Sequence, residues 1–143
     1  MANAPSPTLA HAPIEVDWVG GSQFEAHRPG GPAIRIDGDA QSAPSPFDDL
    51  LAAMATCAAT DVVTILEKQR TPAKGLHVRV EAQRVSETPR RLISAVLHFA
   101  ITAPGATGAK AERAVELAVT RYCSVRSSLS EDAVVTWTID LNS

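Results

Sequence analysis

The sequence predicts an α+β fold with a mainly antiparallel sheet and a long central helix. Three features lead to this prediction. Short segments in which apolar and polar residues alternate are typical of strands that bury one face. Two segments, over 46–69 and 110–122, have the caps and spacing of helices. Strands and helices are partly segregated along the chain, whereas α/β folds alternate them regularly.

The N-terminal part of the chain consists of a tail and three short strands. Residues 1–13 are rich in Ala and Pro without periodicity, so we expect a disordered tail. The remainder, 14–143, is expected to form a single domain because it contains no internal repeat and no linker. Its first strands are expected at three short alternating segments, over 14–18, 24–27 and 33–37.

The long helix is predicted by its caps and by its lack of charge. Ser45 is a good N-cap, Pro46 suits the first helical position, and Asp48 completes a capping box three residues after the cap. The helix should end before Pro72. Residues 50–59 carry no charge on any face, and a helix that is apolar all round must be covered all round. One small sheet covers one side, so we expect a second subunit on the other.

The C-terminal part of the chain predicts a hairpin, a helix and a last strand. Residues 76–83 and 93–101 alternate strictly, which favours an antiparallel hairpin with one solvated face. In 110–122, apolar residues recur at helical spacing and form one stripe. A short helical turn over 124–130 and a strand over 135–141 complete the chain.

Composition excludes several classes of function. The 143 residues are enough for one domain with a real core, and a net charge of −3 argues against a nucleic-acid partner. No apolar run of about 18 residues is expected to span a membrane, and the N-terminus lacks the features of a secretory signal. His77 and His98 could face each other across the hairpin, but a solvated sheet face explains them. We therefore expect a cytoplasmic protein with no membrane partner, metal or cofactor.

Two cysteines remain as candidates for chemistry. Cys57 lies in the apolar middle of the long helix, and Cys123 lies where the second helix ends and a new turn begins. They are too few for a disulfide scaffold or a cysteine-ligated zinc site. They are either inert buried thiols or a redox pair, which can meet only if the two helices pack together. Amides at the start of the new turn should lower the pKa of Cys123. Asp61, one turn after Cys57, is either a buried hydrogen-bonding group or a carboxylate that tunes the thiol.

Several motifs resemble the OsmC/Ohr family, and in particular its YhfA-type branch. They cover nearly all of residues 14–141 in the family's order. The motifs are Ala43–Leu50 with its continuation through Cys57 to Asp61–Leu66, then Arg121–Val125, Val16–Gly21 and Glu87–Arg91. The resemblance implies an entwined homodimer of α+β subunits with the two long helices in the middle.

The resemblance also implies a reaction, which is the thiol-dependent reduction of organic hydroperoxides or of hydrogen peroxide. Cys57 would be the peroxidatic thiol and Cys123 the resolving thiol, and a small-molecule or protein dithiol would restore the pair. Asp48 would be a helix cap, a supporting carboxylate, or both, since the position of the family's glutamate holds Phe47. Candidates for the cation that activates the thiolate are Arg28, Arg35, Arg90 and Arg91.

Two other functions remain open on the sequence. A non-catalytic relative of the same fold would bind a small hydrophobic molecule in the apolar interface, or would sense oxidants through its thiols. A purely structural interaction domain is the third possibility. The retained cysteine pair favours the enzyme, whereas the missing matches for the family's arginine and glutamate favour the non-catalytic relative.

Overall fold

A computed structural model describes residues 6–143 of the chain. The chain divides into two compact units, of which one ends at Asp49 and the other comprises Leu50–Ser143. The single domain expected over 14–143 stays a prediction. Residues 1–5 of the expected tail lie outside the described residues, and 6–14 form neither helix nor strand.

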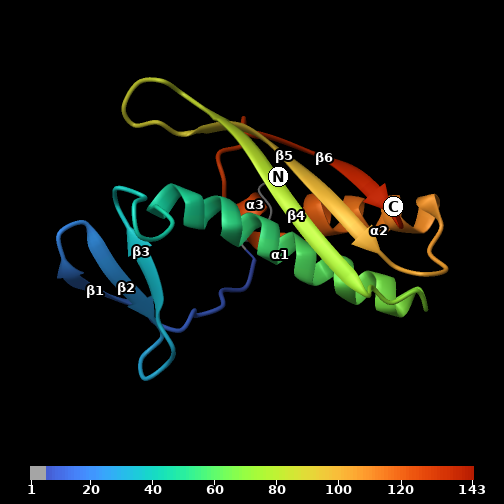
Figure 1. Cartoon of the computed structure of the whole chain (residues 1–143), viewed down its shortest axis with the longest axis horizontal. Helices are drawn as coiled ribbons and strands as arrows, with labels where there is room; N and C mark the ends of the chain where they lie inside the picture. The colour runs from blue at the N-terminus through green and yellow to red at the C-terminus, as the bar shows by residue number, and fades with distance from the viewer. Residues whose placement is uncertain (1–5) are drawn as a thin grey trace. The chain divides into compact units, whose positions relative to one another are not determined.

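The elements of both units follow the order that the sequence predicts (Figure 1). They are β1 (Glu15–Gly20), β2 (Gln23–His27), β3 (Ile34–Asp37), α1 (Pro46–Lys68), β4 (Gly75–Arg84), β5 (Leu92–Thr102), α2 (Gly108–Leu117), the π-helical turn η1 (Ala118–Tyr122), α3 (Ser124–Ser127) and β6 (Val134–Leu141).

The N-terminal unit is built on an antiparallel sheet in the order β1-β2-β3. Trp18 lies opposite Phe24, and Phe24 lies opposite Ile36, so apolar side chains gather on one face. After β3 the chain turns around the buried carboxylate of Asp37. Hydrogen bonds from Ser22, Ser42 and the amide of Asp39 hold the pKa of this carboxyl far below its usual range.

The C-terminal unit is built on a sheet in the order β4-β5-β6. β4 and β5 form the predicted antiparallel hairpin, whereas β6 pairs with β5 in parallel. A parallel neighbour requires a crossover connection, which α2, η1 and α3 supply. On the solvated face His98 lies opposite Arg79, and His77 lies opposite Ala100, so the two histidines do not face each other.

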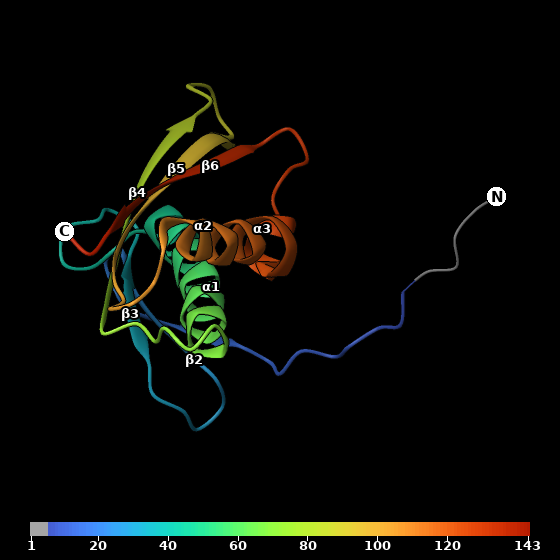
Figure 2. The same cartoon turned by 90° about the vertical axis from the view of Figure 1, so that its right-hand side faces the viewer.

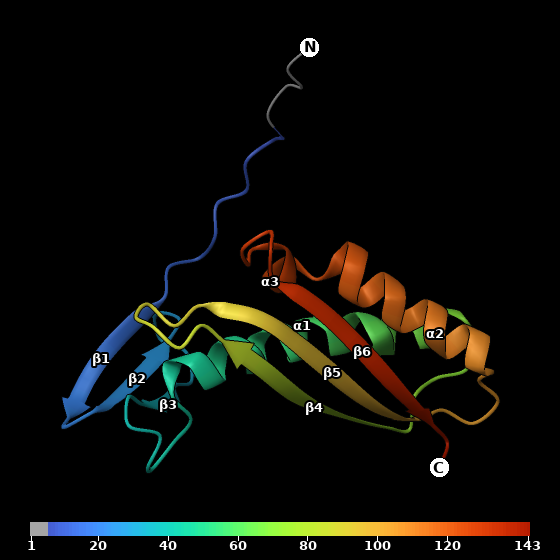
Figure 3. The ribbon, with the colours of Figure 1, turned by 90° about the horizontal axis from the view of Figure 1, so that it is seen from above.

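The core of this unit lies between the sheet and the helices on one of its faces (Figure 2). The inward side chains of β5, including Leu97 and Phe99, meet the buried stripe of α1 at Met54, Val62 and Leu66. Figure 3 shows α2 beside β6, where Trp137 Nε1 donates a hydrogen bond to Glu112 at 3.2 Å. This burial of apolar surface is the main favourable term in the folding of the unit.

The second helix is less regular than its apolar stripe predicts. Regular α-helix ends at Leu117, and the next turn is wider by one residue, as the hydrogen bond from Cys123 N to Ala118 O at 2.9 Å shows. Such a π-turn is a single-residue insertion into a helix and is common beside functional groups. The apolar stripe of the second helix continues through the π-turn with Ala118 and Val119, so the spacing of apolar residues alone did not reveal the turn.

One expectation about membranes needs correction. Among the described residues, α1 is long and apolar enough to cross a membrane by length and composition. Ala, Met, Leu and Val raise the mean hydropathy of α1, although Thr and Asp interrupt any continuous apolar run. The stripe from Met54 to Leu66 is nevertheless packed against the chain's own sheet and helices, as in the core helix of a globular domain.

Candidate functional site

Cys57 lies on the flank of α1, between its buried and its exposed face. Met54 and Ala58 beside it are buried, Thr56 and Thr60 are exposed, and the cysteine itself is partly exposed. The helical spacing of about 100° per residue produces this position. Cys57 is therefore held by the core on one side and remains open to a small molecule on the other.

Cys123 lies at the point where the π-turn ends and α3 begins, and it is 3% exposed. Its backbone is extended, with φ of −71° and ψ of 102°, so its side chain caps α3. The Sγ atom accepts a hydrogen bond from the amide of Arg126 at 3.3 Å and donates to the carbonyl oxygen of Met54 at 3.7 Å. These contacts hold the Cys123 thiol against α1 at Met54, which precedes Cys57 by three residues.

Both thiols are free, and the Cys123 thiol lies against α1. Burial raises the pKa of Cys123, and the neighbouring Cys57 adds to this shift. The expectation that helix-start amides lower this pKa is wrong in its net direction. The backbone amides of Arg126 and Val125 do lower the pKa, but desolvation outweighs them. Cys123 is therefore the thiol that keeps its proton.

Asp48 caps α1, as the sequence predicts. Its carboxylate accepts a hydrogen bond from Ser45 N at 2.9 Å, and its own amide donates to Ser45 Oγ at 3.1 Å, which is a reciprocal capping box. The next residue, Asp49, is half-buried, and its Oδ2 is enclosed without a hydrogen-bond partner among the described residues. Burial, and then the charge of Asp48, raise the pKa of Asp49.

Of the four arginines proposed as activating cations, three form contacts away from the thiols and one is exposed. Arg35 binds Gln23 and Glu25, and Arg91 forms a bidentate pair with Asp132. The Nε of Arg90 donates to Ser86 O at 3.4 Å, and Arg28 is exposed. Arg91 is thus committed to the loop before β6 and not to either thiol.

An open cavity of about 460 Å³ lies between α1 and the second helix, and its lining includes Tyr122, next to Cys123 in sequence, but neither cysteine. Its apolar walls come from Ile65 on α1 and from Leu117 and Tyr122 on the second helix. Asp61, one turn after Cys57, also lines the cavity, and so does Lys68, two turns further along α1. Asp61 is partly buried.

The sequence of the chain decides its family. The profile described as OsmC-like protein matches residues 38–138, which include α1, both cysteines and most of the second sheet. The chain belongs to the OsmC-like family. Protein YhfA of Escherichia coli strain K12 is 36% identical to it over 122 residues, covering 85% of this chain and 91% of that protein.

Solved structures show the same OsmC-like fold. An OsmC-like protein from Mycoplasma pneumoniae matches with a TM-score of 0.79 at 16% identity, covering 92% of this chain and 97% of that one. The organic hydroperoxide resistance protein OhrB of Bacillus subtilis matches with a TM-score of 0.61 at 13% identity, covering 93% and 100%. The predicted family and fold class, α+β with a mainly antiparallel sheet and a long helix, are confirmed.

Sequence reasoning missed three residues, of which two contact Cys123 and one lies at the start of α1. Met54 contributes a backbone carbonyl and Arg126 a backbone amide to Cys123, and such contacts leave no signal in side-chain patterns. Asp49 does leave a signal, since two consecutive carboxylates at a helix start place one of them toward the protein. The capping geometry of Asp48 leaves Asp49 as the half-buried member of that pair.

Proposed function

We propose that this OsmC-like protein is a thiol peroxidase that reduces organic hydroperoxides, or hydrogen peroxide, through Cys57 and Cys123. The observation that carries the proposal is the position of the free Cys123 thiol against α1, where its Sγ lies 3.7 Å from the carbonyl oxygen of Met54, about one turn before the free Cys57. Family membership and the structural likeness to hydroperoxide resistance proteins support the same reaction class. We assign the activity to the cytoplasm, where free thiols persist.

The difference in exposure assigns the roles of the thiols. Cys57 is partly exposed and can meet a peroxide, whereas Cys123 is buried and holds its proton. A thiolate is the nucleophile, so the thiol that keeps its proton is the weaker first attacker. Cys57 is therefore the peroxidatic thiol and Cys123 the resolving thiol.

The reaction proceeds in three balanced steps. The Cys57 thiolate attacks the outer peroxide oxygen, the O–O bond breaks, and the alkoxide takes a proton and leaves as an alcohol, so that Cys57 becomes a sulfenic acid. The sulfur of Cys123 then attacks Cys57, an S–S bond forms and water leaves. A dithiol, either a small molecule or a protein, finally reduces the disulfide by exchange and is itself oxidised.

A homodimer is part of the proposal, and the exposed face of α1 supports it. This face presents Ala53, Thr56, Thr60 and Val63 to solvent. The hydroxyls of Thr56 and Thr60 donate back to carbonyls one turn earlier, at 2.7 and 2.8 Å, so they need no outside partner. An uncharged face whose polar groups are satisfied suits the close approach of a second copy.

The cavity between α1 and the second helix favours a second candidate function, the binding of a small hydrophobic molecule without turnover. Its apolar walls suit such a ligand. An environment-sensitive fluorescent apolar probe should then bind, and Ile65→Lys in the cavity wall should weaken that binding. Ile93→Lys, at an exposed apolar position of β5, is the matched control.

Thiol titration distinguishes the two functions. We expect two reactive thiols per chain under denaturing conditions before the addition of one equivalent of an organic hydroperoxide, and none afterwards. Treatment with a dithiol should restore both. Retention of both thiols in the presence of peroxide would contradict the peroxidase and leave binding as the function.

A further inference from the structure

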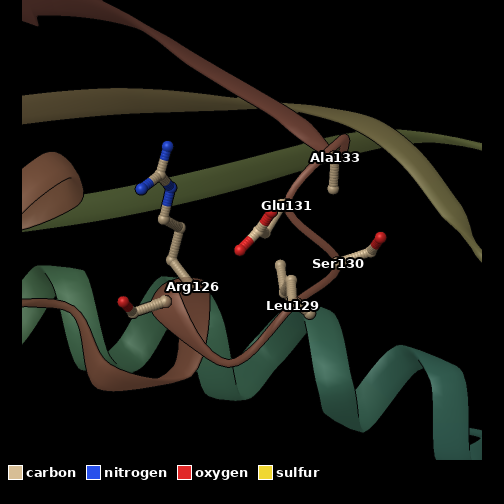
Figure 4. A pocket seen from close by; sticks show the side chains of 6 residues that line it. Arg126, Leu129, Ser130, Glu131 and Ala133 are labelled. Atoms are coloured by element: carbon tan, nitrogen blue, oxygen red, sulfur yellow. The ribbon is translucent and has the colours of Figure 1, made fainter. Parts of the chain in front are cut away.

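A second cavity, separate from the one between α1 and the second helix, lies between α3 and the start of β6. It measures about 300 Å³, and its walls are mostly polar. The residues that line it are Arg126, Ser127, Leu129, Ser130, Glu131 and Ala133. Figure 4 shows that the side chain of Arg126 extends away from α1, so the cavity is on the far side of α3 from the helix that carries Cys57.

Two opposite charges border this cavity without neutralising each other. Arg126 is half-buried, and neither its guanidinium nor the carboxylate of Glu131 forms an ion pair with any described residue. In Figure 4 the carboxylate of Glu131 points back toward the Arg126 side of the cavity, and a gap separates the two groups. A cation and an anion held apart in this way suit a ligand that carries both charges.

The wall of the cavity is fixed in advance by a chain of polar contacts. Ser130 Oγ donates to Asp132 at 2.5 Å, and Asp132 accepts two hydrogen bonds from Arg91, at 3.0 and 2.9 Å. These partners lower the pKa of Asp132 and so keep it ionised. The loop that carries Glu131 is thereby tied to the segment before β5. A preformed site loses little conformational entropy when a ligand binds.

We propose that this cavity binds a free α-amino acid with a small side chain. The carboxylate of the ligand would pair with Arg126, and its ammonium group would pair with Glu131. The hydroxyls of Ser127 and Ser130 would supply neutral hydrogen bonds, and Leu129 and Ala133 would contact the short side chain. The volume of about 300 Å³ accommodates a molecule of this size. The site is independent of the thiol chemistry.

The test is titration of the reduced full-length protein with L-alanine by calorimetry at low salt, together with amide chemical-shift mapping. We expect saturable binding, with shifts concentrated at Arg126 and in the loop before β6. Arg126→Met and Glu131→Gln should each weaken binding about tenfold or more, since each removes a charge-assisted hydrogen bond. Acetate alone and methylammonium alone should bind more weakly than L-alanine, because each satisfies one charge.

The controls separate the site from general electrostatics and from misfolding. Arg113→Met and Glu116→Gln remove an exposed pair of the same residue types on α2 and should leave binding unchanged. The substitution at Arg126 keeps the backbone amide that contacts Cys123, so the variant should still fold. Absence of saturable binding in the folded wild-type protein, or equal binding by the cavity variants, would overturn the proposal.

Discussion

Burial and the neighbouring sulfur of Cys57 raise the pKa of the Cys123 thiol, and the Arg126 amide lowers it. Burial and Cys57 favour the protonated form, and their sum exceeds the stabilisation that the amide gives to the anion. The thiol donates its one hydrogen to Met54 O and accepts from the Arg126 amide. The Sγ atom of Cys123 is thus both the cap of α3 and a contact to α1, the helix that carries Cys57.

Replacement of each cysteine should separate the two chemical steps. Cys57→Ser should abolish peroxide consumption, because the serine hydroxyl is not a comparable nucleophile. Cys123→Ser should permit one stoichiometric oxidation of Cys57 and then stop dithiol-driven turnover, since no disulfide forms. A peroxide assay with limiting protein checks both results, and equal turnover in all three proteins would contradict the two-cysteine cycle.

The pH dependence of Cys123 follows from the direction of its shift. Because its pKa is raised in the folded protein, the unfolded chain loses this proton at lower pH than the folded one. Stability should therefore decline as pH rises from the ordinary thiol pKa through the raised one. Urea denaturation across this alkaline range should show the decline, and Cys123→Ala should remove part of it. The same slope in both proteins would contradict the assignment.

Asp48 forms one half of the capping box of α1, and a substitution there tests whether it has a further role. Asn at this position can still accept the hydrogen bond from Ser45 N, but it carries no charge. If the residue is only a cap, Asp48→Asn should keep stability and peroxide consumption near those of the wild type. A large loss of peroxide consumption in this folded variant would instead make Asp48 a supporting carboxylate.

Ser45 forms the other half of the capping box, and its replacement tests how much the box stabilises the start of α1. Ser45→Ala should lower the free energy of unfolding by about 1 kcal/mol, the usual cost of a lost N-cap. Urea denaturation measures this change. Ser86→Ala, at an exposed position in the turn between β4 and β5, is a matched control that should change stability little.

At the scale of the whole molecule, the proposed dimer through the exposed face of α1 predicts a mass and a way to change it. Light scattering should give about 30 kDa, twice the chain mass of 15.1 kDa. Thr60→Lys places a charge on the face that the second copy would cover, and it should shift the protein toward monomer. Thr136→Lys, at an exposed position of β6, should leave the mass unchanged. A wild-type monomer at all concentrations would contradict the proposed dimer.

The sequence predicts those parts of the molecule that follow from local rules. Alternation located the hairpin of β4 and β5, and the residues Ser45 to Asp48 located the start of α1. The parallel pairing of β6 with β5 depends on a crossover whose direction no local pattern encodes. The direction of the Cys123 pKa shift was missed for a similar reason. Cys123 is only 3% exposed because α1, which is distant in sequence, covers it, and this burial raises its pKa.

The extra residue in η1 has a consequence for the spacing between the thiols. Deleting Thr120, whose hydroxyl bonds only to Glu116 O among the described residues, would let 118–122 rewind as ordinary α-helix. Because the wide turn already absorbs that residue, Cys123 would stay near Met54 O after the deletion. A folded deletion mutant with intact cysteines should then still form a disulfide, whereas rewinding 118–122 with no residue removed would turn Cys123 about 100° around the axis and away from Met54 O.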